Sequence, residues 1–216
     1  MKNKDGGVPK VAIVDYGMGN LLSIGKALET AGSRVQITGD EEEIRASDAL
    51  VLPGVGAFRD AIMRLFPLSE TIVEEAESGK PVLGVCLGLQ LMFTESTEGG
   101  LYQGLNLYRG RVVKLPDSVK VPHMGWNNLR ILKPNHPLLR DVPDGSRAYF
   151  VHSFYGDAED QDVVLATSEY GKLFPAIVGA GNVLATQFHP EKSSDIGLRI
   201  LRNFVAITRS HMKNNA

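Results

Sequence analysis

The stretch KPVLGVCLGLQLMF spans residues 80–93 and contains Cys86, the only cysteine among 216 residues. PVLGV (81–85) is a short apolar run that predicts a buried strand, and LGLQLMF (87–93) predicts a helix directly after it. Cys86 therefore lies where a strand turns at once into a helix, with Gly84 and Gly88 two residues to either side. Two interpretations are open. The cysteine is either a small core residue, as lone cysteines in apolar runs commonly are, or a nucleophile.

The nucleophile interpretation has a physical basis in this kind of turn. A sharp strand-to-helix turn is strained, and flanking glycines remove side chains that would clash with neighbouring backbone. The turn aims Cys86 out of the strand end, where the following helix N-terminus favours a thiolate over a thiol. The amide of Leu87 would then point to where an oxyanion forms.

Around this stretch, strands and helices alternate through the N-terminal half of the chain. Strands are predicted at 11–15, 34–38 and 48–53, and helices from Leu21, from Ala57 and over 69–78. This alternation indicates an α/β fold with a mostly parallel central sheet flanked by helices. From about residue 105 short strands follow one another without long helices, which predicts added antiparallel strands in the C-terminal half. A final helix is predicted over 195–209.

The composition indicates one domain, residues 10–212, behind a disordered polar leader of residues 1–9. Apolar residues make up 43% of the chain, enough to bury a core without disulfide or metal links. With 23 basic and 25 acidic residues, the charge gives no sign of nucleic-acid or membrane binding. A lone cysteine cannot form an internal disulfide, and no window reaches the roughly 18 continuous apolar residues of a membrane span. We therefore expect a cytoplasmic protein.

A second motif, FHPEKSS (188–194), follows a predicted strand near the C-terminus. His189 and Glu191 are two positions apart, so they face the same side of an extended chain. Glu191 could accept the Nδ1 proton of His189 and leave Nε2 as a base for a thiol. Taken alone, the same letters also fit a surface turn.

A third motif, PGVG (53–56), ends the predicted strand 48–53. The amide of Val55 could be a second oxyanion donor, or the segment could be an ordinary turn. Together the three motifs make a set of nucleophile, base, orienting carboxylate and oxyanion donors. All would lie at the carboxyl ends of strands, where an open α/β sheet places its site.

The motifs resemble those of the class I glutamine amidotransferases, whose fold is flavodoxin-like. The superfamily signals are GVCLGLQ (84–90) and FHPE (188–191). Other blocks are similar to the glutaminase subunits of imidazole glycerol phosphate synthase: YGMGN (16–20), PGVGAF (53–58), VPHMGWN (121–127), YFVHSFY (149–155) and HPEKSS (189–194). The resemblance runs in order from residue 15 to residue 194 and departs at no catalytic position.

The resemblance implies a role for each matching residue. Cys86 is the nucleophile, His189 the general base and acid, and Glu191 the group that orients it. The amides of Val55 and Leu87 form the oxyanion pair. The residues implied to hold glutamine are Gly54, Gly56, Gln90, Glu98, His152, Ser153 and Phe154.

Two of these glutamine contacts also follow from the residues themselves. Gln90 lies one helical turn after Cys86 and can face the same pocket. Glu98 offers an anion for the α-ammonium group of an amino acid. The alternatives are a polar residue on an exposed helix face and a solvated loop charge.

The implied reaction is hydrolysis of the L-glutamine side-chain amide through a glutamyl thioester, without cofactor or metal. Ammonia released into neutral water would mostly be protonated, so it needs a sheltered path to its acceptor. The triad domain leaves no residues to build that acceptor site, so a partner chain is expected. The resemblance makes it a (βα)8-barrel cyclase subunit in a heterodimer of histidine biosynthesis. That partner forms imidazole glycerol phosphate and aminoimidazole carboxamide ribotide.

Loops are expected to carry the docking residues Asn20, Met124, Trp126 and Lys192. The alternatives are a core position for Trp126 and a solvated lysine at 192.

Two other functions are weighed: the glutaminase subunit of another class I amidotransferase (pyridoxal phosphate or anthranilate synthesis), and a non-catalytic α/β scaffold with an inactive turn.

Overall fold

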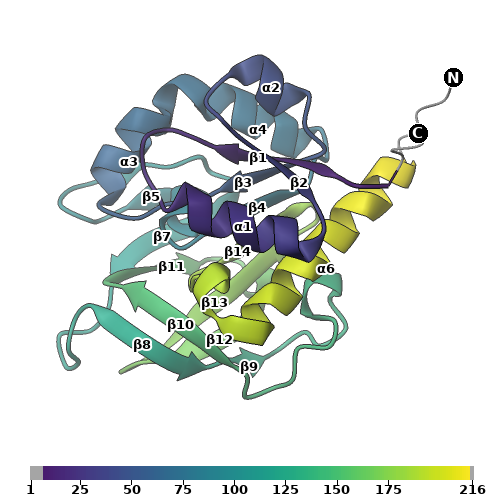
Figure 1. Cartoon of the computed structure of the whole chain (residues 1–216). Helices are drawn as coiled ribbons and strands as arrows, with labels where there is room; N and C mark the ends of the chain where they lie inside the picture. The colour runs from purple at the N-terminus through teal and green to yellow at the C-terminus, as the bar shows by residue number, and fades with distance from the viewer. Residues whose placement is uncertain (1–6, 215–216) are drawn as a thin grey trace, which may run out of the picture.

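A central sheet organises the computed structural model, which describes residues 7–214 and places eight strands in that sheet (Figure 1). In sheet order they are β2 (Arg34–Thr38), β1 (Lys10–Val14), β3 (Ala49–Leu52), β4 (Val82–Val85), β14 (Val183–Thr186), β13 (Leu173–Ala180), β12 (Val164–Glu169) and β9 (Arg130–Ile131). The first five run parallel, and β13, β12 and β9 continue the sheet antiparallel. The predicted sheet of parallel strands with antiparallel additions is therefore confirmed.

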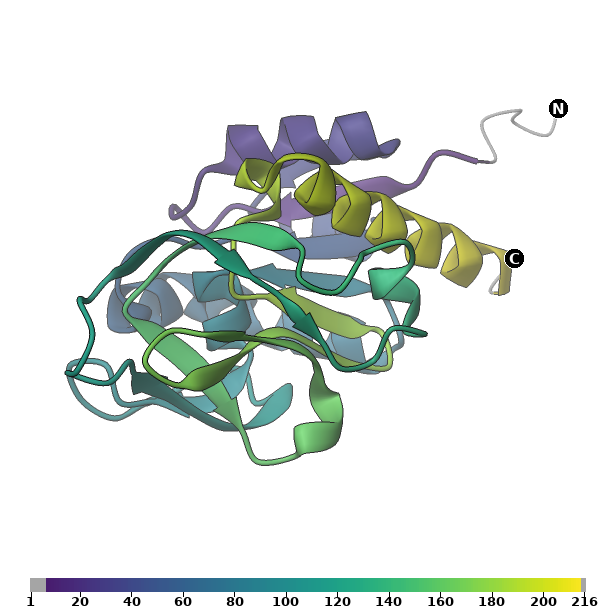
Figure 2. The same ribbon diagram turned by 90° about the horizontal axis from the view of Figure 1, so that it is seen from below.

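Helices cover both faces of this sheet (Figures 1 and 2). Helices α1 (Leu21–Ala31) and α6 (Ser194–Asn214) pack together on one face. On the other lie α3 (Phe58–Leu65), α4 (Ser69–Glu77) and α5 (Leu87–Leu91), with α2 (Glu41–Arg45) against α4. Alternate residues of β1 enter different cores, Ile13 on the first face and Val14 on the second. The inner parallel strands β1, β3, β4 and β14 are buried on both faces and are mostly apolar, whereas the edge strand β2 is partly exposed and contains Arg34 and Gln36.

Helix α1 begins and ends where its sequence predicts. The side chain of Asn20 accepts a hydrogen bond from the amide of Ser23, and Gly32 closes the helix with a φ of 100°. Helix α5 ends two residues earlier than expected, because Phe93 already begins strand β5 (Phe93–Ser96). The five-residue helix α2 was not expected.

Two smaller sheets form from four strands that we expected to extend the central one, together with β5 and β6 (Tyr102–Gln103), which were not predicted. One pairs β10 (Arg147–His152) with β8 (His123–Asn128). The other orders β11 (Phe154–Ala158), β7 (Tyr108–Lys114), β5 and β6. The first buries Phe150 in the core of the α1 and α6 face, and the second buries Phe93 in the opposite core. Both small sheets thus contribute apolar side chains to the cores beside the central sheet.

The expected leader, residues 1–9, falls mostly outside the described residues. Residues 1–6 lie outside the described residues. The carbonyl of Gly7 accepts a hydrogen bond from Nε of Arg209, and the carbonyl of the buried Pro9 accepts one from the amide of Arg34. Residues 7–9 are thus attached to the domain. Within residues 7–214, no helix is both long enough and apolar enough to cross a membrane.

Candidate active site

A pocket of about 370 Å³ lies at the carboxyl end of the parallel strands and contains most of the expected site residues. It is lined by Val55, Gly56, Cys86, Leu87, Gln90, Glu98, Pro122, Val151, His152, Ser153, Phe154 and His189. Of the residues expected to hold glutamine, Gly54 alone is not in this lining. The segments after β3, β4 and β14 meet here because these strands are neighbours and parallel.

The turn at Cys86 has the strained geometry that the sequence predicts. Its φ of 55° and ψ of −107° are unusual for a residue with a side chain. A Cβ on Gly88 would lie 1.8 Å from the carbonyl oxygen of Leu52, and one on Gly84 would lie 2.8 Å from Sδ of Met92. Both glycines therefore permit the close approach of α5 to the sheet. Cys86 is only 5% exposed, so it is buried and also reaches the pocket.

Three groups approach the sulfur and backbone of Cys86. Sγ lies 3.7 Å from the carbonyl oxygen of Val151, and Nε2 of Gln187 lies 3.9 Å from Sγ. The amide of Cys86 donates to the carbonyl of Thr186 on the neighbouring strand. Sequence reasoning did not single out Gln187. The available signal was its position two residues before His189, on the same side of an extended chain.

His189 and Glu191 form the contact that their spacing predicts. Nδ1 of His189 lies 2.9 Å from Oε1 of Glu191, and each side chain is 3% exposed. Within the part of the chain that the structure describes, Nε2 of His189 is buried and has no hydrogen-bond partner. Nδ1 therefore carries a hydrogen and donates it in a hydrogen bond to the carboxylate. Nε2 remains available in the pocket that contains Cys86.

The pKa values of two buried histidines in this pocket are shifted in opposite directions. Burial lowers the pKa of His189, but Cys86 and then Glu191 outweigh it and raise that pKa to about 9. Burial lowers the pKa of His152 to about 3, although its bond to the Phe154 carbonyl acts in the opposite direction. His152 is thus a neutral group, whereas His189 readily takes a proton and as an imidazolium would complement a thiolate at Cys86.

The loop that carries the second expected oxyanion donor is held from two sides. The hydroxyl of Tyr16 donates to the carbonyl of Pro53 at 2.6 Å, and burial raises the pKa of that phenol, which keeps it a donor. On the other side, a Cβ on Gly54 would lie 2.8 Å from Cβ of Leu87. Gly56 follows with a φ of 111°, which favours glycine. The side chain of Val55 is exposed, and the Leu87 amide begins α5 directly after Cys86.

Gln90 and Glu98 reach the pocket, and each also has a structural contact. The side-chain amide of the buried Gln90 donates to the carbonyl of Phe154 at 2.8 Å and to Oε1 of Gln187 at 3.3 Å. Oε2 of Glu98 accepts a hydrogen bond from the amide of Phe58 at the start of α3. Neither is the solvated residue of the alternative interpretation.

The expected docking residues are exposed, but two of them lie on a strand and not in a loop. Met124 is 67% and Trp126 is 45% exposed on β8, with the indole edge-on to Tyr149. The core position weighed for Trp126 is therefore wrong. Asn20 is exposed before α1, and Lys192 is exposed in the short 3-10 helix Pro190–Lys192.

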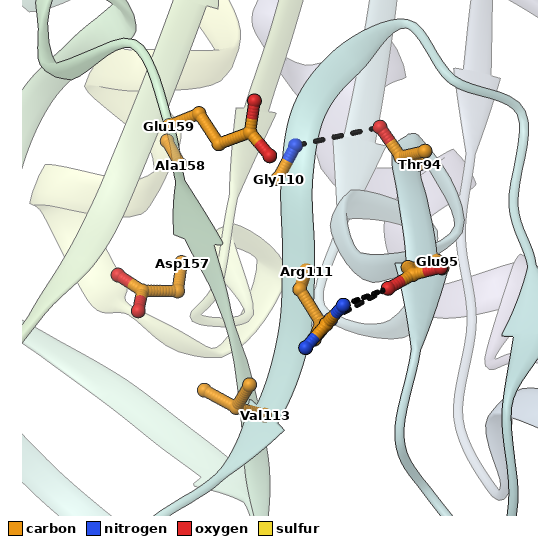
Figure 3. A pocket seen from close by; sticks show the side chains of 8 residues that line it. All are labelled: Thr94, Glu95, Gly110, Arg111, Val113, Asp157, Ala158 and Glu159. Atoms are coloured by element: carbon orange, nitrogen blue, oxygen red, sulfur yellow. Dashed lines mark hydrogen bonds and ion pairs between the residues drawn. The ribbon is translucent and has the colours of Figure 1, made fainter.

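A separate open groove lies over β5, β7 and β11 (Figure 3). Its lining comprises Thr94, Glu95, Gly110, Arg111, Val113, Asp157, Ala158 and Glu159. Arg111 forms an ion pair with Glu95 on the neighbouring strand, so the positive charge of the groove already has a partner.

Within residues 7–214, no cluster of three or more His, Cys, Asp or Glu side chains is placed to hold a metal ion.

The fold and the site define a class of protein. Residues 12–207 match the family model described as glutamine amidotransferase class-I, so the chain belongs to the class I glutamine amidotransferases. The fold also matches the solved structure of PurLQS from Thermotoga maritima with a TM-score of 0.74. That match covers 93% of this chain and 99% of the other at 19% identity, which supports the fold alone.

Within that class, two curated relatives of similar sequence share one description. The chain is 55% identical over 199 residues to the imidazole glycerol phosphate synthase subunit HisH of Methanosarcina mazei, covering 91% of this chain and 98% of the relative. It is 49% identical over 211 residues to the subunit of the same description in Halalkalibacterium halodurans, covering 94% and 98%. The chain is a member of the family of these HisH subunits.

Proposed function

We propose that this chain is the glutaminase subunit of an imidazole glycerol phosphate synthase in histidine biosynthesis, with residues 10–212 as its catalytic domain. One observation carries the proposal. A histidine oriented by a buried carboxylate leaves its second nitrogen without a partner among the described residues, in the pocket that holds a cysteine on a strained turn. This is the arrangement of an activated thiol nucleophile and its base.

The reaction begins with attack of the Cys86 thiolate on the side-chain carbonyl carbon of L-glutamine. The C–S bond forms as the carbonyl electron pair moves to oxygen, and the amides of Leu87 and Val55 stabilise the oxyanion. His189 gives its Nε2 proton to the leaving nitrogen, the C–N bond breaks, and ammonia departs from a glutamyl thioester. Water then attacks the thioester, with His189 accepting its proton, and releases glutamate and the thiol.

The acidic side chain in the pocket, Glu98, suits the α-ammonium group of an amino-acid substrate. Glu98 keeps one carboxylate oxygen on the α3 amide and can accept the α-ammonium group with the other. Gly54, Gly56, Gln90 and the backbone of residues 152–154 complete the site that we propose for glutamine. Gln187, whose side-chain amide faces Sγ, adds a donor that stabilises negative charge on sulfur.

The released ammonia requires a partner chain. We propose that a (βα)8-barrel cyclase subunit docks on the face that exposes Asn20, Met124, Trp126 and Lys192, and receives ammonia without its passing through bulk water. An exposed tryptophan beside a methionine is a common anchor of protein interfaces. Such a heterodimer works in the cytoplasm, on L-glutamine and a ribulosyl nucleotide.

The test compares Cys86→Ala with the unchanged chain, each mixed with purified cyclase subunit. We expect the substitution to abolish glutamine-dependent synthesis and to spare synthesis driven by added ammonium. Loss of both activities would mean that Cys86 is structural.

The unchanged chain tests the two other functions. Another class I glutaminase predicts no rise in glutamine hydrolysis when the cyclase is added. A non-catalytic scaffold predicts that a glutamine-mimicking electrophile labels Cys86 no faster than a free thiol.

A further inference from the structure

Two buried histidines, His123 and His152, connect strand β8 with the pocket. They face each other in the register of β8 and β10, and Nδ1 of His123 lies 3.0 Å from Nε2 of His152. His152 lines the pocket, whereas His123 does not. The proposed reaction assigns no role to His123.

The hydrogen-bond partners fix where the protons of this pair lie. Nδ1 of His152 is 2.9 Å from the carbonyl oxygen of Phe154, which can only accept, so Nδ1 carries the hydrogen. Nε2 of the neutral His152 must then accept, and Nδ1 of His123 must donate to it. Nε2 of His123 is left to accept from the side-chain amide of Asn127 at 3.3 Å, and that amide also donates to the carbonyl of Glu169. One set of proton positions satisfies every contact.

This chain of hydrogen bonds ends on the backbone that lines the pocket. The Phe154 carbonyl accepts from His152 and also from the side chain of Gln90. Gln90 in turn contacts Gln187, which faces the sulfur of Cys86. The position of the 152–154 segment therefore depends on the orientation of the His152 ring, and that orientation depends on the donor at His123.

Packing alone does not explain a histidine at position 123. Its ring stacks on Tyr170, with centroids 4.1 Å apart and planes 18° apart, and on Phe150, with centroids 5.1 Å apart and planes 23° apart. A phenylalanine ring would fill such a slot without burying two polar nitrogens, which costs free energy unless both are bonded. The buried imidazole is thus explained by its two hydrogen bonds.

We propose that His123 is a positioning residue for glutamine binding, which acts through His152 to hold the 152–154 segment in its pocket-forming conformation. This inference rests on the proposed glutaminase function. His123 touches neither substrate nor reacting atoms in this role, so its loss should weaken glutamine binding more than the chemical step.

Two substitutions separate this role from packing. In His123→Asn the side-chain amide nitrogen can occupy the position of Nδ1 and keep the donation to His152. In His123→Gln the amide lies at the position of Nε2, so the contact with Asn127 is kept and the donation to His152 is lost. Both variants lose the aromatic stacking, which makes each the control for the other.

The measurement is glutamine hydrolysis by each variant in complex with the cyclase subunit. We expect KM for glutamine to rise about ten-fold in His123→Gln, the effect of leaving one buried acceptor unpaired, and to stay within about three-fold in His123→Asn. The value of kcat and ammonium-driven synthesis should be similar in the two variants. Equal KM values for the two variants would overturn the proposal, because packing would then explain the residue.

Amide hydrogen exchange gives a second test that needs no activity. Exchange in residues 152–154 should be faster in His123→Gln than in His123→Asn, and equal rates would refute the positioning role. If the unchanged complex hydrolysed no glutamine, the proposed function would be wrong, and the exchange rates would still decide whether His123 positions this segment.

Discussion

The strained turn at Cys86 predicts that glycine at this position gives a more stable protein than alanine, the reverse of the usual order. With φ at 55° and ψ at −107°, any residue with a Cβ is strained at position 86. Cys86→Ala keeps that strain and Cys86→Gly removes it, while both remove the thiol. We therefore expect the glycine variant to be the more stable of the two, although glycine normally destabilises a folded chain relative to alanine.

The difference in stability between the glycine and alanine variants follows from two opposing effects. Backbone strain of this kind costs about 2 kcal/mol in the folded state. Replacing alanine by glycine costs about 1 kcal/mol, because the unfolded chain gains freedom. The difference favours glycine by about 1 kcal/mol, which corresponds to a melting temperature about 2–4 °C higher for a chain of this length.

Thermal and urea unfolding of the two variants, followed by circular dichroism, measure this difference. Ala206→Gly in the interior of α6 is the control, because its backbone is helical and the substitution should cost about 1 kcal/mol. If Cys86→Ala were as stable as Cys86→Gly while the control behaved normally, the turn would not store the strain that its dihedral angles indicate.

Three further predictions concern the same site. Gly88→Ala should destabilise the fold by about 3 kcal/mol, because its Cβ would lie 1.8 Å from the Leu52 carbonyl oxygen. The control is Gly25→Ala in α1, where the nearest atom is at 3.5 Å and the substitution should be neutral or stabilising. Equal melting temperatures for the two variants would contradict the predicted clash. Glu191→Gln should lower kcat about 10²-fold in steady-state assays with little change in KM, since the His189 ring loses its orienting anion, and an unchanged kcat would exclude that role. The pKa of His189 is raised from 6.5 to about 9, so protonated His189 stabilises the folded protein. Its contribution to the free energy of unfolding should be complete below pH 6.5 and lost as the pH rises through about 9. Urea unfolding across this pH range should show the loss in the unchanged protein and not in His189→Gln.

Local patterns were sufficient to predict the central parts of the fold and site. The turn at Cys86 could be read because an apolar strand, two glycines and a helix are contiguous in the sequence. The contact between His189 and Glu191 could be read because residues two apart share a side of extended chain. Both depend on backbone geometry over a few residues, and both are present in the structure.

Contacts between distant segments could not be read in this way. The bond from Tyr16 to Pro53 joins loops after two different strands, and the approach of Gln187 to Cys86 depends on the pairing of β14 with β4. Such contacts require the strand order and register, which a single sequence does not specify. The docking loop predicted around Trp126 is instead strand β8, in which Gly125 has a φ of 141°.

One missed role did have a signal in the sequence. Helix α3 begins after Ala57, and alanine has no side-chain acceptor for the free amides of a helix N-terminus. An acceptor from elsewhere in the chain was therefore to be expected, and Glu98 supplies it to the amide of Phe58. The contact also restrains the Glu98 carboxylate, which is the group that we propose to bind the substrate ammonium.

Strand β10 contacts both the proposed nucleophile, Cys86, and its proposed base, His189. The carbonyl of Tyr149 accepts the backbone amide of His189 at 3.0 Å, and two residues along the strand the carbonyl of Val151 lies 3.7 Å from Sγ of Cys86. Both carbonyls belong to the two-stranded sheet and not to β4 or β14, the strands that precede Cys86 and His189. One strand outside the central sheet therefore makes both contacts. Because β10 pairs with β8, the strand that exposes Met124 and Trp126 is the hydrogen-bonded neighbour of the strand that makes both contacts.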